Sequence, residues 1–187
     1  GVLFERLAPQ GPRKVCAPIR LLNLDRSYLG TLGLRDLFAA LASSRAPQLV
    51  SLSVRCTASK GGLFANKRKH DEMAKALADV VLRCQDLERL YLTGGEGSHF
   101  KSDLLPALAA LASNATIRVL DVSNNNAGDD AVQALAGSLS TNETLEKLSL
   151  DGNAASAAAI KALAEGLERN TSVHACDLPR RDCALAA

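Results

Sequence analysis

The side chains best suited to chemistry in this sequence are three histidines and five cysteines, and their spacing matches no familiar site. The histidines are His70, His99 and His174, and no two cysteines form a CxxC pair. A metal site needs several ligands to converge, and nucleophilic catalysis needs a base and an orienting group beside the nucleophile. The one local group of possible ligands is His174, Cys176 and Asp177, and strand alternation places Asp177 on the opposite side of the strand from the other two. We therefore expect no metal site and reduced cysteines of the cytosolic kind.

A glycine-rich turn, Gly94-Gly95-Glu96-Gly97, is similar in composition to a phosphate-binding loop. It lacks the lysine and the serine or threonine that such loops place on phosphate and magnesium. The sequence also contains no GxSxG, GxxxxGK[ST] or HExxH motif. Asp129 and Asp130 fall at an expected helix start, where acidic groups interact favourably with the helix dipole. The sequence predicts neither an enzyme nor a bound cofactor.

The elements that must position any binding residues are clearest between residues 117 and 170, where one unit is written twice. Each copy has an LxxLxL strand pattern and then a helical stripe spaced i, i+3, i+4, i+7. The second copy follows the first by 28 residues: Ile117, Leu120, Val122, Asn125, Val132, Leu135, Ala136 and Leu139 recur as Leu145, Leu148, Leu150, Asn153, Ile160, Leu163, Ala164 and Leu167. A strand and helix of this size cannot bury both faces alone, so the pattern predicts stacked repeats in a solenoid.

The same strand pattern starts at residues 19, 49, 87, 117, 145 and 173. We interpret 19–172 as five repeats, 1–18 as the end of a preceding repeat or a lead-in, and 173–187 as a partial repeat and C-terminal cap. The second repeat is lengthened by the segment 57–71, which must loop out. After Pro179 the pattern stops, and we expect no helix there.

This repeat length, and an NxT junction before the last strands, resemble the ribonuclease-inhibitor-like class of leucine-rich repeat proteins. The resemblance implies an α/β solenoid: a right-handed βα horseshoe with a parallel sheet on its concave face and helices on its convex face. In that class an asparagine after each strand hydrogen-bonds the neighbouring backbone in a ladder. Asn125 and Asn153 match it, Ser27 and Thr57 replace it in part, and Gly95 cannot. We expect an interrupted ladder and looser turns in the first three repeats.

Within that class the C-terminal portion is most similar to CARMIL proteins, through the GLERNTSV junction at 166–173 and an exit containing Pro179, Asp182 and Leu185. The resemblance implies a non-enzymatic scaffold of the cytoplasmic, actin-rich cortex that links myosin I, capping protein and actin assembly. A tropomodulin-like domain that caps actin pointed ends is the nearest alternative. A GTPase-activating or ribonuclease-inhibitor-type repeat protein is more distant.

Two surfaces are candidates for binding. Side chains between the buried strand positions point to the concave face. There we expect a protein-binding set: Arg55, Arg89, Tyr91, Asp121, Lys147 and Asp151. A basic group in the long insertion suits acidic lipid or acidic protein: Lys60, Lys67, Arg68 and Lys69. The alternatives are a solvated face that binds nothing and an ordinary surface helix start.

The overall charge and hydropathy narrow the partners to proteins. The chain has 22 basic and 20 acidic residues, a net charge of +2, so no global field favours nucleic acid. No apolar stretch approaches the roughly 20 residues that cross a bilayer, so membrane contact is expected through other parts of a longer protein or weakly through the basic insertion. A solenoid opened at its first repeat exposes an apolar edge, and we expect self-association there.

Overall fold

The computed structural model describes residues 18–43, 48–55, 67–95, 97–177 and 179–186 of the 187-residue chain. Six strands form one parallel sheet, ordered in space as in the sequence. They are β1 (Leu21–Asn23), β2 (Ser51–Ser53), β3 (Arg89–Tyr91), β4 (Val119–Asp121), β5 (Lys147–Ser149) and β6 (Ala175–Cys176). Lys60 and Thr57 lie outside the described residues.

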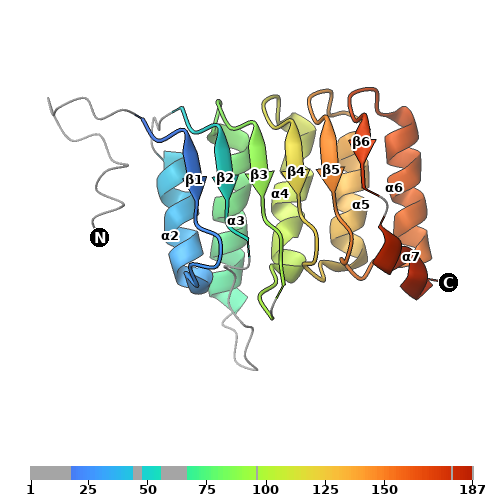
Figure 1. Cartoon of the computed structure of the whole chain (residues 1–187), viewed down its shortest axis with the longest axis horizontal. Coiled ribbons are helices and arrows are strands. Elements are labelled where there is room, and N and C mark those ends of the chain that lie inside the picture. The colour runs from blue at the N-terminus through green and yellow to red at the C-terminus, as the bar shows by residue number, and fades with distance from the viewer. Residues whose placement is uncertain (1–17, 44–47, 56–66, 96, 178, 187) are drawn as a thin grey trace, which may run out of the picture.

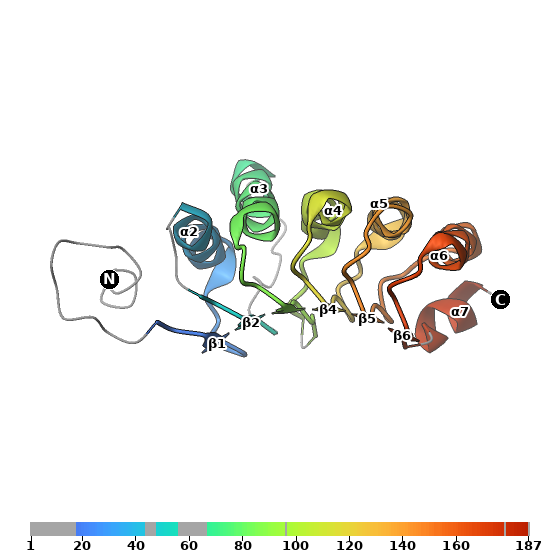
Figure 2. The ribbon, with the colours of Figure 1, turned by 90° about the horizontal axis from the view of Figure 1, so that it is seen from above.

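A helical segment follows each strand. The longer helices are α2 (Gly30–Ser43), α3 (Lys67–Arg83), α5 (Gly128–Leu139) and α6 (Ala157–Arg169). The third repeat has a short α4 (Leu105–Ala110) between two 3-10 turns, Lys101–Leu104 and Leu111–Ser113, and the chain finishes in α7 (Arg180–Ala186). Figure 1 shows the strands side by side with the helices behind them. Figure 2 shows the strands along the inner side of a shallow arc and α2 to α6 along its outer side. The chain is therefore an α/β leucine-rich repeat solenoid.

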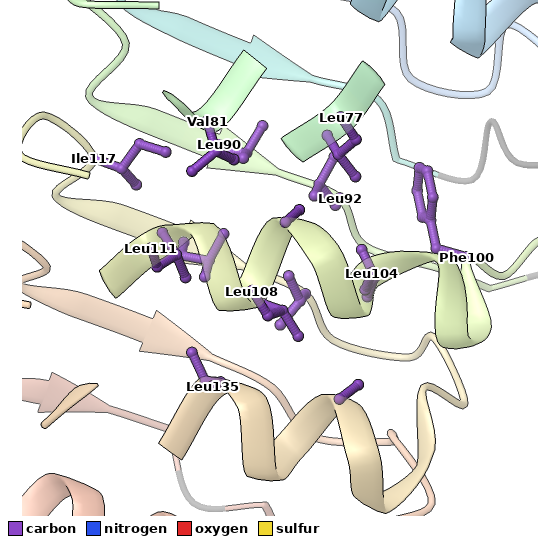
Figure 3. Close-up of a cluster of buried hydrophobic side chains, with 14 of the residues drawn as sticks. Leu77, Val81, Leu90, Leu92, Phe100, Leu104, Leu108, Leu111, Ile117 and Leu135 are labelled. Atoms are coloured by element: carbon purple, nitrogen blue, oxygen red, sulfur yellow. The ribbon is translucent and has the colours of Figure 1, made fainter. Parts of the chain in front are cut away.

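The core lies between the sheet and the helices, where the expected apolar positions meet. Leu52, Leu90, Leu120 and Leu148 are in register across the sheet and at most 2% exposed. Figure 3 shows the third repeat, where side chains of α3, β3 and α4 converge. Phe100 belongs to this cluster and is 2% exposed, although it lies in an irregular turn for which the repeat pattern predicts no core position. Burying a side chain of this size stabilises the fold by about 1.5–3 kcal/mol.

The end of the solenoid differs from expectation, because α7 follows Pro179 where no helix was predicted. Proline suits a helix start, since the amide hydrogen that it lacks has no partner in the first turn. The first turn of α7 is capped from another repeat: Asp151 Oδ1 accepts from the amide of Arg181 at 2.8 Å. The start of α7 therefore depends partly on Asp151, which lies 30 residues earlier in the sequence than Arg181.

The apolar stripe of α6 also departs from prediction at Ala164, which is exposed. Its counterpart one repeat earlier, Ala136, is 6% exposed because α6 packs on it. In the described part of the chain no helix of full length packs on the outer side of α6, and its buried positions are instead Ala159, Leu163 and Gly166. The same residue type in the same register is therefore buried or exposed according to its neighbour.

The turn after β1 is not looser than those of the later repeats, which corrects another expectation. Arg26 and Tyr28 have φ values of 57° and 50°, and their counterparts Asn124 and Asn126 have 58° and 50°. Left-handed backbone is unfavourable for a residue as large as tyrosine. Stacking of the repeats therefore holds this turn in the common geometry although its side chains do not favour it.

At the strand exits a ladder of polar side chains joins the later repeats. Asn125 is fully buried, and its Nδ2 donates to the carbonyl of Leu92 in the preceding repeat at 2.8 Å. Asn153 donates likewise to the carbonyl of Val122 at 3.1 Å. Asp182, also fully buried, accepts from the amides of Asn153 and Ala154 at 3.0 and 2.9 Å. Asp182, which belongs to the exit pattern, thus forms the last step of the ladder.

A second ladder, which sequence reasoning did not assign, runs along the NxT junctions. Asn142 Nδ2 donates to the carbonyls of Leu111 and Asn114, and Asn170 Nδ2 donates to those of Leu139 and Asn142, at 2.7–2.9 Å. Each asparagine of this ladder also accepts amide hydrogens from the second and third residues after it. The junction asparagines therefore both shape their own turn and bond the preceding repeat.

Candidate functional site

The concave face is organised in rows, because the strands pair in register. The N-terminal row, defined by the first strand positions, contains Leu21, Ser51, Arg89, Val119, Lys147 and Ala175. The middle row contains Asn23, Ser53, Tyr91, Asp121 and Ser149, followed by Asp177. Two residues further along the strands is the C-terminal row: Asp25, Arg55, Thr93, Ser123 and Asp151. All six predicted concave-face residues therefore belong to one surface.

Three of these residues form a cluster in the middle of the face. The guanidinium carbon of Arg55 lies 4.7 Å from the centroid of the Tyr91 ring, a cation–π contact. Arg55 Nη2 is 4.0 Å from Asp121 Oδ2, with side chains 43% and 20% exposed, so this pair is a weak surface interaction. The cluster places a carboxylate beside a tyrosine ring and a guanidinium, and tyrosine and arginine are residue types that contribute strongly at protein interfaces.

Each carboxylate of the face has a partner on a neighbouring strand or loop. Ser53 Oγ donates to Asp25 at 2.6 Å, and the backbone amide of Arg55 donates to the same carboxylate at 2.9 Å. Thr93 Oγ1 donates to Asp121 at 2.8 Å. Asp151 accepts from the amide of Arg181 at 2.8 Å and so caps α7, and binding of a partner by Asp151 stays a prediction.

Ser149 Oγ donates to Asp177, the residue after β6, at 2.6 Å. Three hydroxyl groups of the middle and C-terminal rows thus donate hydrogen bonds to aspartates of the same face: those of Ser53, Thr93 and Ser149. Hydrogen bonds of this kind hold the carboxylates in fixed positions and reduce their capacity to accept further donors.

Arg89 and Lys147 lie apart from the cluster. Both are exposed, and neither side chain has a hydrogen bond or ion pair with any residue that the structure describes. They stand in register on β3 and β5, with Val119 of β4 between them. These two basic groups are therefore available for an external partner.

The basic insertion group is the start of α3. Lys67, Arg68 and Lys69 form its exposed first turn. Arg68 pairs with Glu72 one turn along, at 2.9 Å, and Glu72 also accepts from Arg35 of α2 at 3.0 Å. These bonds, first the one from Arg35 and then the one from Arg68, hold the pKa of Glu72 below its usual value. Lipid or acidic-protein binding by this group stays a prediction.

Cys84 occupies the position of the junction asparagine between the second and third repeats. Its thiol lies 3.7 Å from the carbonyl of Leu41 on α2, and burial raises its pKa to about 11. A thiol of this kind is almost wholly protonated at neutral pH, so it is a poor nucleophile. Cys84 is therefore a structural residue.

The strand exits carry a hollow of about 430 Å³ lined by glycine turns, His99, Asn124 and Arg181. His99 Nδ1 lies 2.7 Å from the carbonyl of Asn124, to which it donates a hydrogen bond. No nucleophile with a base and an orienting group was found at this hollow, and no cluster of three or more metal-ligating side chains occurs among the described residues. Nor does any helix in the described ranges have both the length and the apolar character required to cross a membrane.

No protein-family model matches the sequence, and no curated protein does. Among solved structures, the chain is similar to "Leiomodin-1 Actin-Binding Site 2 (ABS2)", with a TM-score of 0.54 and 15% sequence identity, over 81% of this chain and 85% of that one. At this identity the likeness concerns the fold, and it agrees with the repeat architecture seen here.

Proposed function

We propose that this chain is a non-enzymatic protein-binding domain whose partner is actin or an actin-associated protein. The observation that carries the proposal is the likeness of fold to an actin-binding domain over most of both chains. The concave face supplies a surface for it, with the Arg55–Tyr91–Asp121 cluster near its middle. We place the domain in the cytoplasm, at the actin-rich cortex.

The finer form of the proposal is a CARMIL-like scaffold that links myosin I, capping protein and actin assembly. It is supported by the exit pattern, since Pro179 precedes α7 and Asp182 is buried against the last turn. In this form the solenoid presents its surface to myosin I or to another cytoskeletal regulator.

A tropomodulin-like domain that caps actin pointed ends is the second candidate, because the similar solved structure is itself named as an actin-binding site. Actin is then the direct partner. The two candidates differ in one observable: a pointed-end capper slows filament elongation, whereas a scaffold does not.

Cosedimentation with filamentous actin, and elongation of actin from seeds with blocked barbed ends, test the proposal. Binding with slowed elongation supports the capper, and binding to a myosin I without slowed elongation supports the scaffold. No binding to either protein at concentrations up to roughly 100 µM, the range of weak transient complexes, refutes the proposal.

Two tyrosines provide a matched pair of variants. Tyr91→Ala removes the aromatic ring from the concave cluster and should weaken binding about tenfold, as expected for an interface aromatic residue. Tyr28→Ala is the control, because Tyr28 is 70% exposed and lies in the turn after β1, outside the three rows. Equal losses from both variants would place the binding surface elsewhere.

A further inference from the structure

Charge is segregated along the strands of the concave face. The N-terminal row carries Arg89 and Lys147 and no carboxylate. The middle and C-terminal rows carry one basic residue, Arg55, and four aspartates: Asp25, Asp121, Asp151 and Asp177. A partner that covers the face therefore meets a basic border, which is the N-terminal row, and an acidic border, which consists of the middle and C-terminal rows.

The two borders differ in how much hydrogen-bonding capacity remains. All four aspartates already accept hydrogen bonds from hydroxyl or amide groups of this chain. The side chains of Arg89 and Lys147 make none with the described residues. The unused groups of the face are thus mainly charged donors, which are complementary to carboxylates.

The carboxylates beside the basic border have arginine neighbours. At the strand entries beside it, Glu146 is paired with Arg118. Glu88 shares a hollow of about 440 Å³ with Arg20 and Arg118, and Asp86 also lines that hollow. The carboxylates nearest to Arg89 and Lys147 in the sequence therefore have basic neighbours of their own.

The distance between Arg89 and Lys147 determines how far apart two carboxylates of a ligand must lie. Arg89 and Lys147 are separated by two strand intervals, about 10 Å. In an extended chain the side chains of one face recur at every second residue, so residues i and i+4 lie about 13 Å apart with residue i+2 between them. The long side chains of arginine, lysine and glutamate cover the remaining difference of about 3 Å. Val119 lies between the two basic groups and is half-buried, so it offers an apolar contact at the centre.

We propose that the N-terminal row binds an acidic segment of a protein partner, laid across β3, β4 and β5, with one carboxylate on Arg89, a second on Lys147 and an apolar residue over Val119. This inference rests on the proposed protein-binding function and names the chemistry of the partner. The charge of the row is what selects such a segment, and mobile ions weaken the contact because all its charges are exposed.

Fluorescence anisotropy with a labelled peptide of about ten residues tests the inference. The peptide has glutamate at every fourth position, valine midway between glutamates and threonine elsewhere, so that in extended form its glutamates and valines share one face. A peptide with lysine in place of glutamate is the ligand control. The chain should bind the glutamate peptide, more weakly as salt increases, and should not bind the lysine peptide.

Two double variants with the same change in net charge distinguish binding at the N-terminal row from nonspecific attraction by the overall charge of the chain. Arg89→Glu with Lys147→Glu should reduce affinity at least about tenfold. Lys75→Glu with Lys161→Glu, on the exposed faces of α3 and α6, should leave affinity within about twofold. Equal losses from the two variants, or no binding of the glutamate peptide, would overturn the inference. Stronger binding to vesicles of anionic lipid than to the peptide, sensitive to the first variant, would overturn it too.

The same variants on actin or myosin I keep the two proposals distinguishable. Partner binding that survives Arg89→Glu with Lys147→Glu overturns this inference and leaves the proposed function intact. Peptide binding by a chain that binds neither actin nor myosin I overturns the proposed function and leaves the acidic-segment site intact.

Discussion

Removal of the Asn142 side chain should strongly destabilise the chain. Asn142 is 3% exposed and makes four side-chain bonds to backbone: its Nδ2 donates to the carbonyls of Leu111 and Asn114, and its Oδ1 accepts from the amides of Thr144 and Leu145. A hydrogen bond contributes about 1 kcal/mol net, and a buried group left unpaired costs about 1–3 kcal/mol. Asn142→Ala should therefore lower the free energy of unfolding by about 4 kcal/mol, a large part of the roughly 5–15 kcal/mol typical of a domain.

Urea denaturation followed by circular dichroism measures this loss, and two further variants sharpen it. Asn23→Ala removes an exposed asparagine with one local bond, to the amide of Asp25, and should cost less than about 1 kcal/mol. Asn142→Asp keeps the acceptor but turns a second oxygen toward two carbonyls, so it should be at least as harmful as alanine at neutral pH. If Asn142→Ala and Asn23→Ala differ by less than about 0.5 kcal/mol, the ladder does not stabilise the fold as argued.

The structure also predicts the direction of the change in stability for four other substitutions. Gly166→Ala should destabilise α6 by about 2 kcal/mol or more despite the higher helix propensity of alanine, because a Cβ there would lie 2.6 Å from a carbonyl oxygen of α5. Gly137→Ala is the control, because a Cβ there meets nothing within 4 Å. It should stabilise the chain by roughly 0.5–1 kcal/mol in the same denaturation assay. Cys84→Asn should raise the unfolding midpoint by extending the junction ladder to α2, and an unchanged or lower midpoint would contradict this. Hydrogen bonds from the amide and hydroxyl of Ser156 hold the pKa of Asp129 below its usual value, so their stabilisation is complete above the unfolded pKa of about 4 and is lost as pH falls through the lower folded pKa. Asp129→Asn should accordingly flatten the acid limb of the stability–pH curve, and an unchanged limb would show that this contact contributes nothing.

The sequence predicted those parts of the fold that depend on local periodicity. Leu90, Leu120 and Leu148 lie where the LxxLxL spacing placed them, because alternation in a strand fixes which side chains are buried. The α2 stripe is likewise buried at all four expected positions: Leu34, Leu37, Phe38 and Leu41.

The features that the sequence did not predict depend on neighbours in space. The exposure of Ala164 follows from what packs on α6, and the cap of α7 comes from Asp151 in the preceding repeat. The bonds of Asn142 reach backbone about 30 residues earlier, so its NxT motif could be read as a junction but not as a ladder. At the candidate site the sequence placed residues on a face, whereas the contact of Arg55 with Tyr91 required the register of the strands.

The uneven distribution of the two asparagine ladders gives the solenoid a mechanical polarity. Every asparagine of the ladders lies after residue 113, whereas the described contacts between the first two repeats are sheet bonds, apolar packing, the Arg35–Glu72 pair, the bonds to Asp25 and the contact of the Cys84 thiol with α2. Under tension between its ends, the chain should therefore yield first at β1 and α2, while the repeats from β4 onward remain folded. A domain built in this way can lengthen at one end and still hold a partner at the other.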